Sequence, residues 1–212
     1  MISVFGNRKV SGSLWSKKRK VLHHYNRLAG IYDSLYGEEQ KSKIESILKL
    51  LNFGCKDMVL DAGCGTGLLI EYIAVRVNHL VGVDLAGESL KIAIERSRRL
   101  GVKRKVSLLR ADVDHLPFRD TVFDKIFALT LLQNVPEPCE TLREMLRVTK
   151  SNSQVAVTGL KKHFTEENFS RLIRRIGREY VFAETEEPHD IIAVVKADKV
   201  KNKYRQKEGI ER

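Results

Sequence analysis

Residues 59–67 read VLDAGCGTG, and this stretch decides how the rest of the chain is interpreted. A short apolar run ends in Asp61, three glycines follow at alternate positions, and an apolar helical pattern begins at Leu68. We therefore expect a strand, a tight turn and the start of a helix, because glycine lets the backbone approach a ligand in conformations closed to other residues. The GxGxG spacing is not the GxGxxG of dinucleotide sites, and the Lys-Ser/Thr pair of a phosphate-binding P-loop is missing.

Acidic residues also end the next two apolar runs. Asp84 closes residues 79–84, and Asp112 closes residues 106–112. An acid about twenty residues after a glycine turn, at the end of the second strand, can accept hydrogen bonds from both hydroxyls of a ribose. A fourth motif, LPFRDTVFD, follows at residues 116–124.

With these four motifs in order, the chain resembles the class I S-adenosylmethionine-dependent methyltransferases over nearly its whole length. The LPF motif is typical of the subgroup that includes the quinone-biosynthesis methyltransferases. The resemblance implies S-adenosyl-L-methionine as the cofactor, with its ribose on Asp84 and its adenine amino group facing Asp112. The cofactor-binding residues that it implies are Asp61, Gly63, Gly65, Gly67, Asp84, Leu85, Asp112, Val113, Leu131 and Tyr32. No metal site is expected.

Strand and helix patterns alternate along the chain, which predicts an α/β fold with a doubly wound, mostly parallel sheet. By resemblance, it is a seven-stranded Rossmann-like methyltransferase sheet with a C-terminal antiparallel hairpin. The expected strands are 58–62, 80–84, 106–111, 123–131, 153–160, 180–186 and 190–196. The expected helices are 66–77, 87–100, 136–149 and 165–177. We expect one domain at 21–196 with a helical lid at 21–51, between a flexible basic tail at 1–20 and a basic tail at 197–212.

The net charge of +11 is concentrated at the two ends of the 212-residue chain. Residues 1–20 hold six Lys or Arg and no acid, and residues 196–212 hold seven Lys or Arg and three acids. Such ends are usually solvated and disordered, but they also attract the phosphates of nucleic acids. Four arginines share one stripe of the expected helix 165–177, opposite an apolar face. The expected RNA-binding residues are Lys17, Lys18, Arg19, Lys20, Arg171, Arg174, Arg175 and Arg178.

Other features of the sequence indicate where in the cell the protein functions. The sequence has no apolar run long enough for a membrane helix and no secretory signal at its N-terminus. Its three scattered cysteines fit neither a disulfide framework nor a zinc pair. We expect a cytoplasmic enzyme without a membrane partner.

The candidate catalytic residues are Asn134 and Pro136, which follow the fourth expected strand. In methyltransferases that act on exocyclic amines, Asn/Asp-Pro-Pro-aromatic stands here, and its side-chain oxygen accepts an amine hydrogen. This chain has a looser version, with Val135 in the middle and Glu137 at the aromatic position. The alternative is that Asn134 caps the helix that begins near Pro136.

The basic residues favour an RNA substrate, as in an archaeal-type RNA base methyltransferase. The expected activity is methylation of rRNA or tRNA, with an exocyclic amine such as cytosine N4 as the target. The alternative is a small molecule such as a quinone precursor. A non-enzymatic partner subunit is a third reading, which the intact Asp61 and glycine turn oppose. Some RNA-modifying relatives also require a small activator protein, and the sequence leaves that partner open.

Overall fold

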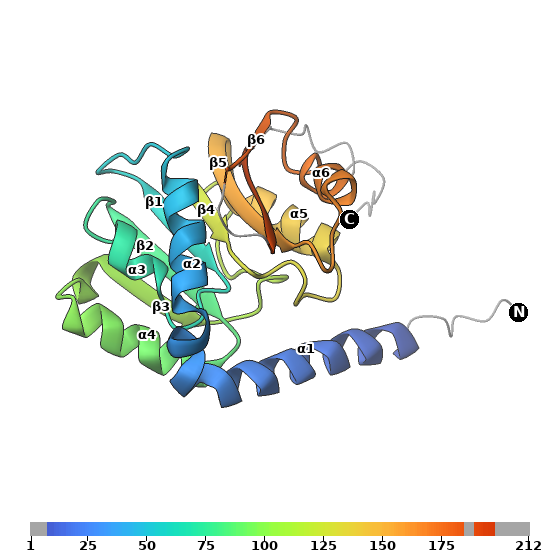
Figure 1. The fold of residues 1–212 in the computed structure, drawn as a ribbon, viewed down its shortest axis with the longest axis horizontal. Coiled ribbons are helices and arrows are strands. Elements are labelled where there is room, and N and C mark those ends of the chain that lie inside the picture. The colour runs from blue at the N-terminus through green and yellow to red at the C-terminus, as the bar shows by residue number, and fades with distance from the viewer. Residues whose placement is uncertain (1–7, 185–188, 198–212) are drawn as a thin grey trace, which may run out of the picture.

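The computed structural model describes residues 8–184 and 189–197. Within these residues, seven strands form one sheet in the order β3-β2-β1-β4-β5-β7-β6 (Figure 1). Neighbouring strands from β3 to β5 pair in parallel, whereas β7 pairs antiparallel with both β5 and β6. The strands are β1 (Met58–Ala62), β2 (His79–Asp84), β3 (Val106–Arg110), β4 (Phe123–Ala128), β5 (Thr149–Leu160), β6 (Tyr180–Phe182) and β7 (Asp190–Lys196). The doubly wound sheet with an antiparallel C-terminal strand is confirmed.

Helices cover both faces of the sheet, and each face has its own apolar core. One core packs the sheet against α2, α3 and α4, with Ile47 and Ile73 fully buried. The other packs it against α5 and α6, with Met145 and Phe169 fully buried. The helices are α1 (Arg8–Leu28), α2 (Tyr32–Leu48), α3 (Leu69–Ile73), α4 (Gly87–Arg99), α5 (Pro138–Val148) and α6 (Glu166–Ile173), with short 3-10 turns at Ala29–Ile31 and Lys103–Lys105. None of the described helices is both long and apolar enough to cross a bilayer.

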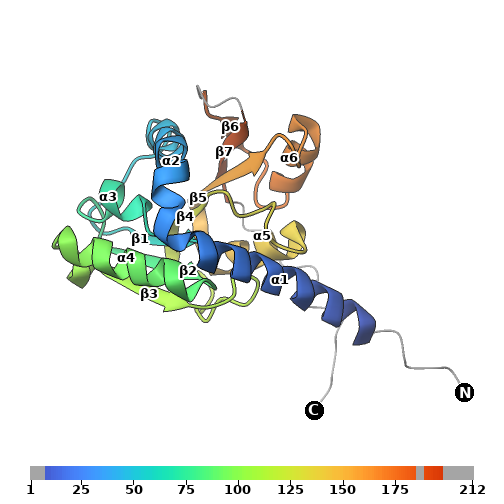
Figure 2. The same ribbon diagram turned by 60° about the horizontal axis from the view of Figure 1, so that its bottom comes forward.

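The expected flexible tail at 1–20 is wrong for residues 8–20, which belong to α1. This helix extends along the edge of the sheet at which the parallel strands end (Figure 2). It is fastened there because Lys17 donates to the carbonyl of Val135 at 2.8 Å and Lys18 donates to Asp112 at 2.5 Å. Residues 1–7 and 198–212, which carry the rest of both predicted tails, lie outside the described residues.

The expected helix 165–177 is too long, because α6 ends at Ile173 and not near residue 177. The chain turns there so that Gly177 can pass β7, where a Cβ atom would lie 1.9 Å from the carbonyl oxygen of Lys196. Only Arg171 therefore lies within the helix, where it pairs with Glu167 at 2.8 Å. Arg174 packs over the ring of Tyr180 at 5.8 Å. The buried apolar face of this segment is confirmed for Phe169, Leu172, Ile173 and Ile176.

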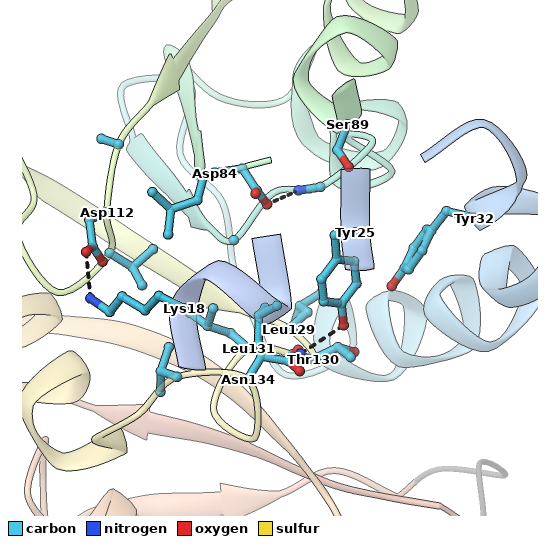
Figure 3. Close-up of a pocket in the computed structure, with 17 residues that line it drawn as sticks. Lys18, Tyr25, Tyr32, Asp84, Ser89, Asp112, Leu129, Thr130, Leu131 and Asn134 are labelled. Atoms are coloured by element: carbon cyan, nitrogen blue, oxygen red, sulfur yellow. Dashed lines mark hydrogen bonds and ion pairs between the residues drawn. The ribbon is translucent and has the colours of Figure 1, made fainter. Parts of the chain in front are cut away.

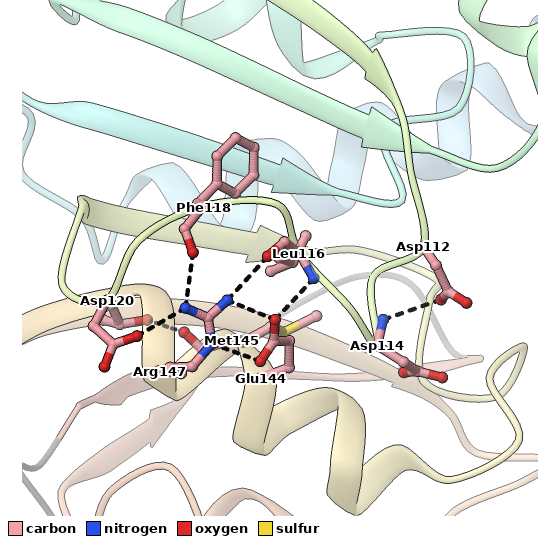
Figure 4. A network of polar contacts seen from close by, with 9 residues as sticks. Asp112, Asp114, Leu116, Phe118, Asp120, Glu144, Met145 and Arg147 are labelled. Atoms are coloured by element: carbon pink, nitrogen blue, oxygen red, sulfur yellow. Dashed lines mark hydrogen bonds and ion pairs between the residues drawn. The ribbon is translucent and has the colours of Figure 1, made fainter.

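The LPF motif forms a loop that α5 holds in place (Figure 4). Arg147 donates to the carbonyls of Leu116 and Phe118 at 3.0 and 2.8 Å, and its guanidinium also bonds Glu144. Glu144 in turn accepts from the backbone N–H of Leu116 at 2.8 Å. Burial opposes the ionisation of Glu144, but the hydrogen bonds from Arg147 and Leu116 outweigh it and lower the pKa of this carboxyl. The loop is thereby fixed directly after Asp112, which lies at the carboxyl edge of the sheet.

Candidate functional site

The glycine turn after β1 leaves open space above its backbone. Gly63, Gly65 and Gly67 all have positive φ angles between 52° and 78°, a region that other residues rarely adopt. A Cβ on Gly63 would lie 2.9 Å from the side chain of Leu131, whereas a Cβ on Gly65 would meet nothing within 4 Å. The turn therefore packs tightly on one side and faces a cavity at Gly65.

Asp84, at the end of β2, is held by this turn. Its two carboxylate oxygens accept backbone hydrogen bonds from Gly65 at 2.8 Å and Ala86 at 2.7 Å. Burial raises the pKa of Asp84, and these backbone hydrogen bonds oppose the shift. The backbone of Leu85 also donates to this carboxylate, so the group is firmly oriented and keeps only part of its acceptor capacity for a ligand.

Asp112, after β3, meets a lysine from α1. Lys18 lies 2.5 Å from a carboxylate oxygen of Asp112 and 2.6 Å from one of Asp114. Burial opposes the charge on Lys18, but its hydrogen bonds to the two carboxylates raise its pKa. Thr141 of α5 donates to the other oxygen of Asp114. This ion-pair cluster ties α1 to the part of the site that the sequence assigned to adenine.

Asn134 follows β4, and its side chain faces α1. Its amide nitrogen donates to the carbonyl of Thr130 at 2.7 Å and to the hydroxyl of Tyr25 at 2.9 Å (Figure 3). The residue that precedes α5 is Glu137, and it makes no side-chain cap. The interpretation of Asn134 as a helix cap is therefore wrong, because its amide group is used within the turn and by the lid.

Thr130 explains why β4 ends at Ala128 and not at residue 131. Its φ is 53°, and its backbone N–H donates to the hydroxyl of Thr158 at 2.7 Å instead of continuing the ladder. Its own hydroxyl accepts from Gln40 of α2 at 3.0 Å. Lys43, fully buried and 2.6 Å from Asp190, lies 3.3 Å from the same hydroxyl. A buried polar network therefore fixes the turn that carries Asn134.

The start of α2 is tied to the glycine turn. The hydroxyl of Thr66 donates to Asp33 at 2.6 Å, and the guanidinium of Arg96 bonds the other oxygen of Asp33. Arg96 is only 6% exposed. These contacts set the position of Tyr32, the neighbour of Asp33, whose side chain reaches the cavity.

All of these elements surround one cavity of about 770 Å³ that is partly open to solvent (Figure 3). The predicted residues that line it are Tyr32, Gly63, Gly65, Asp84, Leu85, Asp112, Val113, Leu131 and Asn134.

Asp61 lines a smaller adjoining pocket together with Gly63, Gly65 and Tyr32. It is 5% exposed, and none of the described basic side chains forms an ion pair with it. Burial, and then the charge of Asp84, raises the pKa of Asp61 to about 7. None of the described cationic side chains therefore neutralises the carboxylate in this pocket.

Two of the predicted cofactor-binding and catalytic residues, Gly67 and Pro136, lie outside both pockets. A Cβ on Gly67 would lie 2.8 Å from that of Ala93, so this glycine allows α4 to pack against the turn. Pro136 is absent from both linings and stands beside Val135, which does line the larger cavity.

Sequence reasoning missed several residues of the cavity wall. The residues that were not predicted to line it are Lys18, Val21, Tyr25, Ser89, Ala111, Leu129, Thr130 and Val135. Tyr25 and Val21 belong to the lid, whose path over the site only the fold reveals. Ser89 and Thr130 carry no sequence signal, because a single hydroxyl near a turn is common.

The sheet order, the glycine turn and the oriented Asp84 define a Rossmann-like α/β protein. A family model described as a methyltransferase domain matches residues 60–157. A phosphatidylethanolamine N-methyltransferase of Cereibacter sphaeroides is 31% identical over 147 residues, which cover 69% of this chain and 70% of that protein. A ubiquinone/menaquinone biosynthesis C-methyltransferase of Idiomarina loihiensis is 30% identical over 166 residues, with 74% and 65% covered.

Among solved structures, a chain from the complex of the Haloferax volcanii Trm112 methyltransferase activator superposes with a TM-score of 0.70. It is 16% identical, and the match covers 82% of this chain and 97% of that one, so it shows the fold alone. This chain spans about half the length of several other curated relatives that it matches. The chain belongs to the class I S-adenosylmethionine-dependent methyltransferases. The resemblance to the quinone-biosynthesis group is confirmed, and family membership implies S-adenosyl-L-methionine as the cofactor.

Proposed function

We propose that this chain transfers the methyl group of S-adenosylmethionine to a small organic acceptor held beneath α1. The observation that carries the proposal is that Asp84, Asn134 and side chains of α1 line the same cavity. The residues fit the cofactor: the oriented carboxylate of Asp84 suits the ribose hydroxyls, and the carboxylate of Asp112 suits an amino group. Asp61, a buried carboxylate without a described cationic partner, suits the ammonium group of the methionine part.

When bound, the cofactor supplies a methyl group on a sulfonium that acts as its own leaving group. The protein then has to hold the acceptor in line with that methyl carbon and exclude water. Tyr25 and Val21 of α1 cover the cavity, and Leu131 and Val135 form apolar wall on the β4 side. These side chains restrict water and leave the acceptor few orientations.

A small acceptor is favoured over RNA because two of the predicted phosphate-binding residues are already engaged. Lys17 binds the carbonyl of Val135, and Lys18 is held between Asp112 and Asp114. The relatives at about 30% identity carry names of phospholipid and quinone methyltransferases. The apolar side chains of Val21, Leu131 and Val135 in the cavity wall suit the carbon skeleton of a small organic acceptor.

RNA remains the second candidate, because the outer surface is basic. Arg19 and Lys20 of α1 and Arg175 near the end of α6 are exposed, and the net charge is +11. Binding to phosphates would weaken steeply as salt rises, since released counterions set the slope. An activator subunit such as the one in the Haloferax complex would belong to this candidate.

Labelled methyl transfer distinguishes the two candidates. The full chain is incubated with S-adenosylmethionine labelled on its methyl group and with separate metabolite, lipid, RNA and protein extracts of the source organism. We expect label in the metabolite or lipid fraction. Label in RNA, lost as salt rises, would favour the second candidate, and unlabelled fractions throughout would contradict the proposal.

Asp61 should make cofactor binding depend on pH. Because its pKa in the free protein is about 7, the carboxyl is protonated below that pH and must release the proton before it can pair with an ammonium group. The affinity for S-adenosylmethionine should therefore fall by up to about tenfold for each pH unit below 7, as linkage requires. Calorimetry between pH 5.5 and 7 measures this change in affinity. In that range the amino group of the cofactor stays charged, because the ordinary α-amino pKa is about 7.7–8.0.

The matched control is Asp61→Asn, which cannot titrate. Its affinity should be weaker at pH 7 and nearly constant over the same range. A wild-type affinity that stays flat from pH 7 to 5.5, or a slope that survives in Asp61→Asn, would remove Asp61 from the cofactor site.

A further inference from the structure

The orientation of the Asn134 amide is fixed by its neighbours. A backbone carbonyl can only accept a hydrogen bond, so the group 2.7 Å from the carbonyl of Thr130 must be the amide nitrogen. The same nitrogen also donates to the hydroxyl of Tyr25 at 2.9 Å. Both of its hydrogens are used, and the side-chain oxygen of Asn134 is left as an acceptor. None of the described residues donates a hydrogen bond to that oxygen.

Tyr25 supplies the complementary group. Its oxygen accepts the hydrogen bond from Asn134, so its own proton remains available for donation. Burial raises the pKa of Tyr25, which keeps the hydroxyl protonated at neutral pH. Its ring is positioned by edge contact with His24, at 5.4 Å between centroids, and by the tilted ring of Tyr32 at 6.1 Å.

The two side chains therefore present a donor and an acceptor side by side to one cavity (Figure 3). The acceptor comes from the turn after β4, which Thr130 and its buried network hold rigid. The donor comes from α1, which Lys17 and Lys18 fasten to the same edge. Such a pair is complementary to a group that carries the opposite pattern, an N–H next to a hydrogen-bond acceptor.

We propose that Tyr25 and Asn134 together select an acceptor in which an amino group stands one carbon away from a hydrogen-bond-accepting ring nitrogen or carbonyl. This inference rests on the proposed function and names its substrate class, amino-heterocycles and related amidine-type groups. The amine donates one hydrogen to Asn134, and the neighbouring acceptor atom takes the proton of the Tyr25 hydroxyl. An amine without that neighbour would leave the hydroxyl unpaired in a half-buried site, which is unfavourable.

The chemical step balances with these two residues. The amine nitrogen uses its lone pair to bond the methyl carbon while the carbon–sulfur bond breaks, and that electron pair stays on sulfur as a neutral thioether. The positive charge passes to nitrogen, where the Asn134 oxygen stabilises it. The nitrogen then loses one proton to water.

Two probes of the same size test the selection. 2-Aminopyrimidine has ring nitrogens beside its amino group, whereas aniline has the same amine without them. Ligand-observed NMR titration of each into the chain saturated with S-adenosylhomocysteine gives the two affinities. We expect 2-aminopyrimidine to bind at least about tenfold more tightly, the effect of pairing one buried hydroxyl.

Tyr25→Phe should remove this preference while the affinity for S-adenosylhomocysteine stays unchanged. The matched control is Tyr36→Phe, because Tyr36 is 38% exposed and does not line the cavity, and it should keep the preference. Equal binding of the two probes, no binding of 2-aminopyrimidine, or a preference that persists in Tyr25→Phe would overturn the inference. Absence of S-adenosylhomocysteine binding would overturn the proposed function as well, so the two failures are distinguishable.

Discussion

Replacement of Asp84 by alanine should weaken the binding of S-adenosylmethionine at least about tenfold for each ribose hydrogen bond that is lost. Hydrogen bonds to a charged group contribute roughly 1.5–3 kcal/mol each, and about 1.4 kcal/mol corresponds to tenfold in affinity. The carboxylate is already oriented by Gly65 and Ala86, so little is lost in arranging it for a ribose. Calorimetry at pH 7 and low salt measures the change.

The control for this variant is Glu88→Gln, because Glu88 is an exposed carboxylate in the first turn of α4, the helix that follows Asp84. It should bind the cofactor like the wild type. Circular dichroism must show that Asp84→Ala is folded, since the backbone N–H groups of Gly65 and Ala86 lose their acceptor. A folded Asp84→Ala chain with unchanged affinity would place the ribose elsewhere.

Asn134→Ala should lower the turnover rate by about 10²–10³, the usual cost of losing one preorganised electrostatic contact to a transition state. Cofactor affinity should change little, because the proposed contact of Asn134 is to the nitrogen of the acceptor and not to the cofactor. The measurement is the single-turnover rate with the acceptor identified by labelled transfer. Thermal unfolding should stay close to that of the wild type, apart from the loss of the contacts to Thr130 and Tyr25.

Asn168→Ala is the matched control, since Asn168 is exposed in the first turn of α6. It should turn over at the wild-type rate. Full activity in Asn134→Ala, or inactivity that accompanies loss of folded structure, would reduce Asn134 to a structural residue of the turn.

The cofactor side of the site could be predicted because each of its residues belongs to a short sequence pattern, either an acid at the end of an apolar strand or a glycine turn. Parallel strands bring their carboxyl ends to one edge, so acids that close successive apolar runs meet there. Asp84 and Asp112 were placed in this way, and both line the cavity. The glycine turn was equally readable, because positive φ angles at Gly63 and Gly65 require that residue type.

The acceptor side could not be predicted, because it depends on contacts between distant segments. Lys17 and Lys18 have the composition of a solvated tail, yet their partners lie more than ninety positions away in sequence. The partner of Asn134 across the cavity is Tyr25, 109 positions away. The arginine spacing indicated a continuous helix, but the close approach of Gly177 to β7 interrupts it. None of these contacts produces a periodic pattern in the sequence from which it could be predicted.

A crystal structure of the chain with S-adenosylhomocysteine decides where the cofactor binds. We expect both ribose hydroxyls within ordinary hydrogen-bond distance of the Asp84 carboxylate, about 2.5–3.0 Å. We also expect the adenine amino group at Asp112 and the ammonium group at Asp61. Adenosine density away from Asp84 and Asp112, or a ligand bound outside the cavity beneath α1, would contradict it.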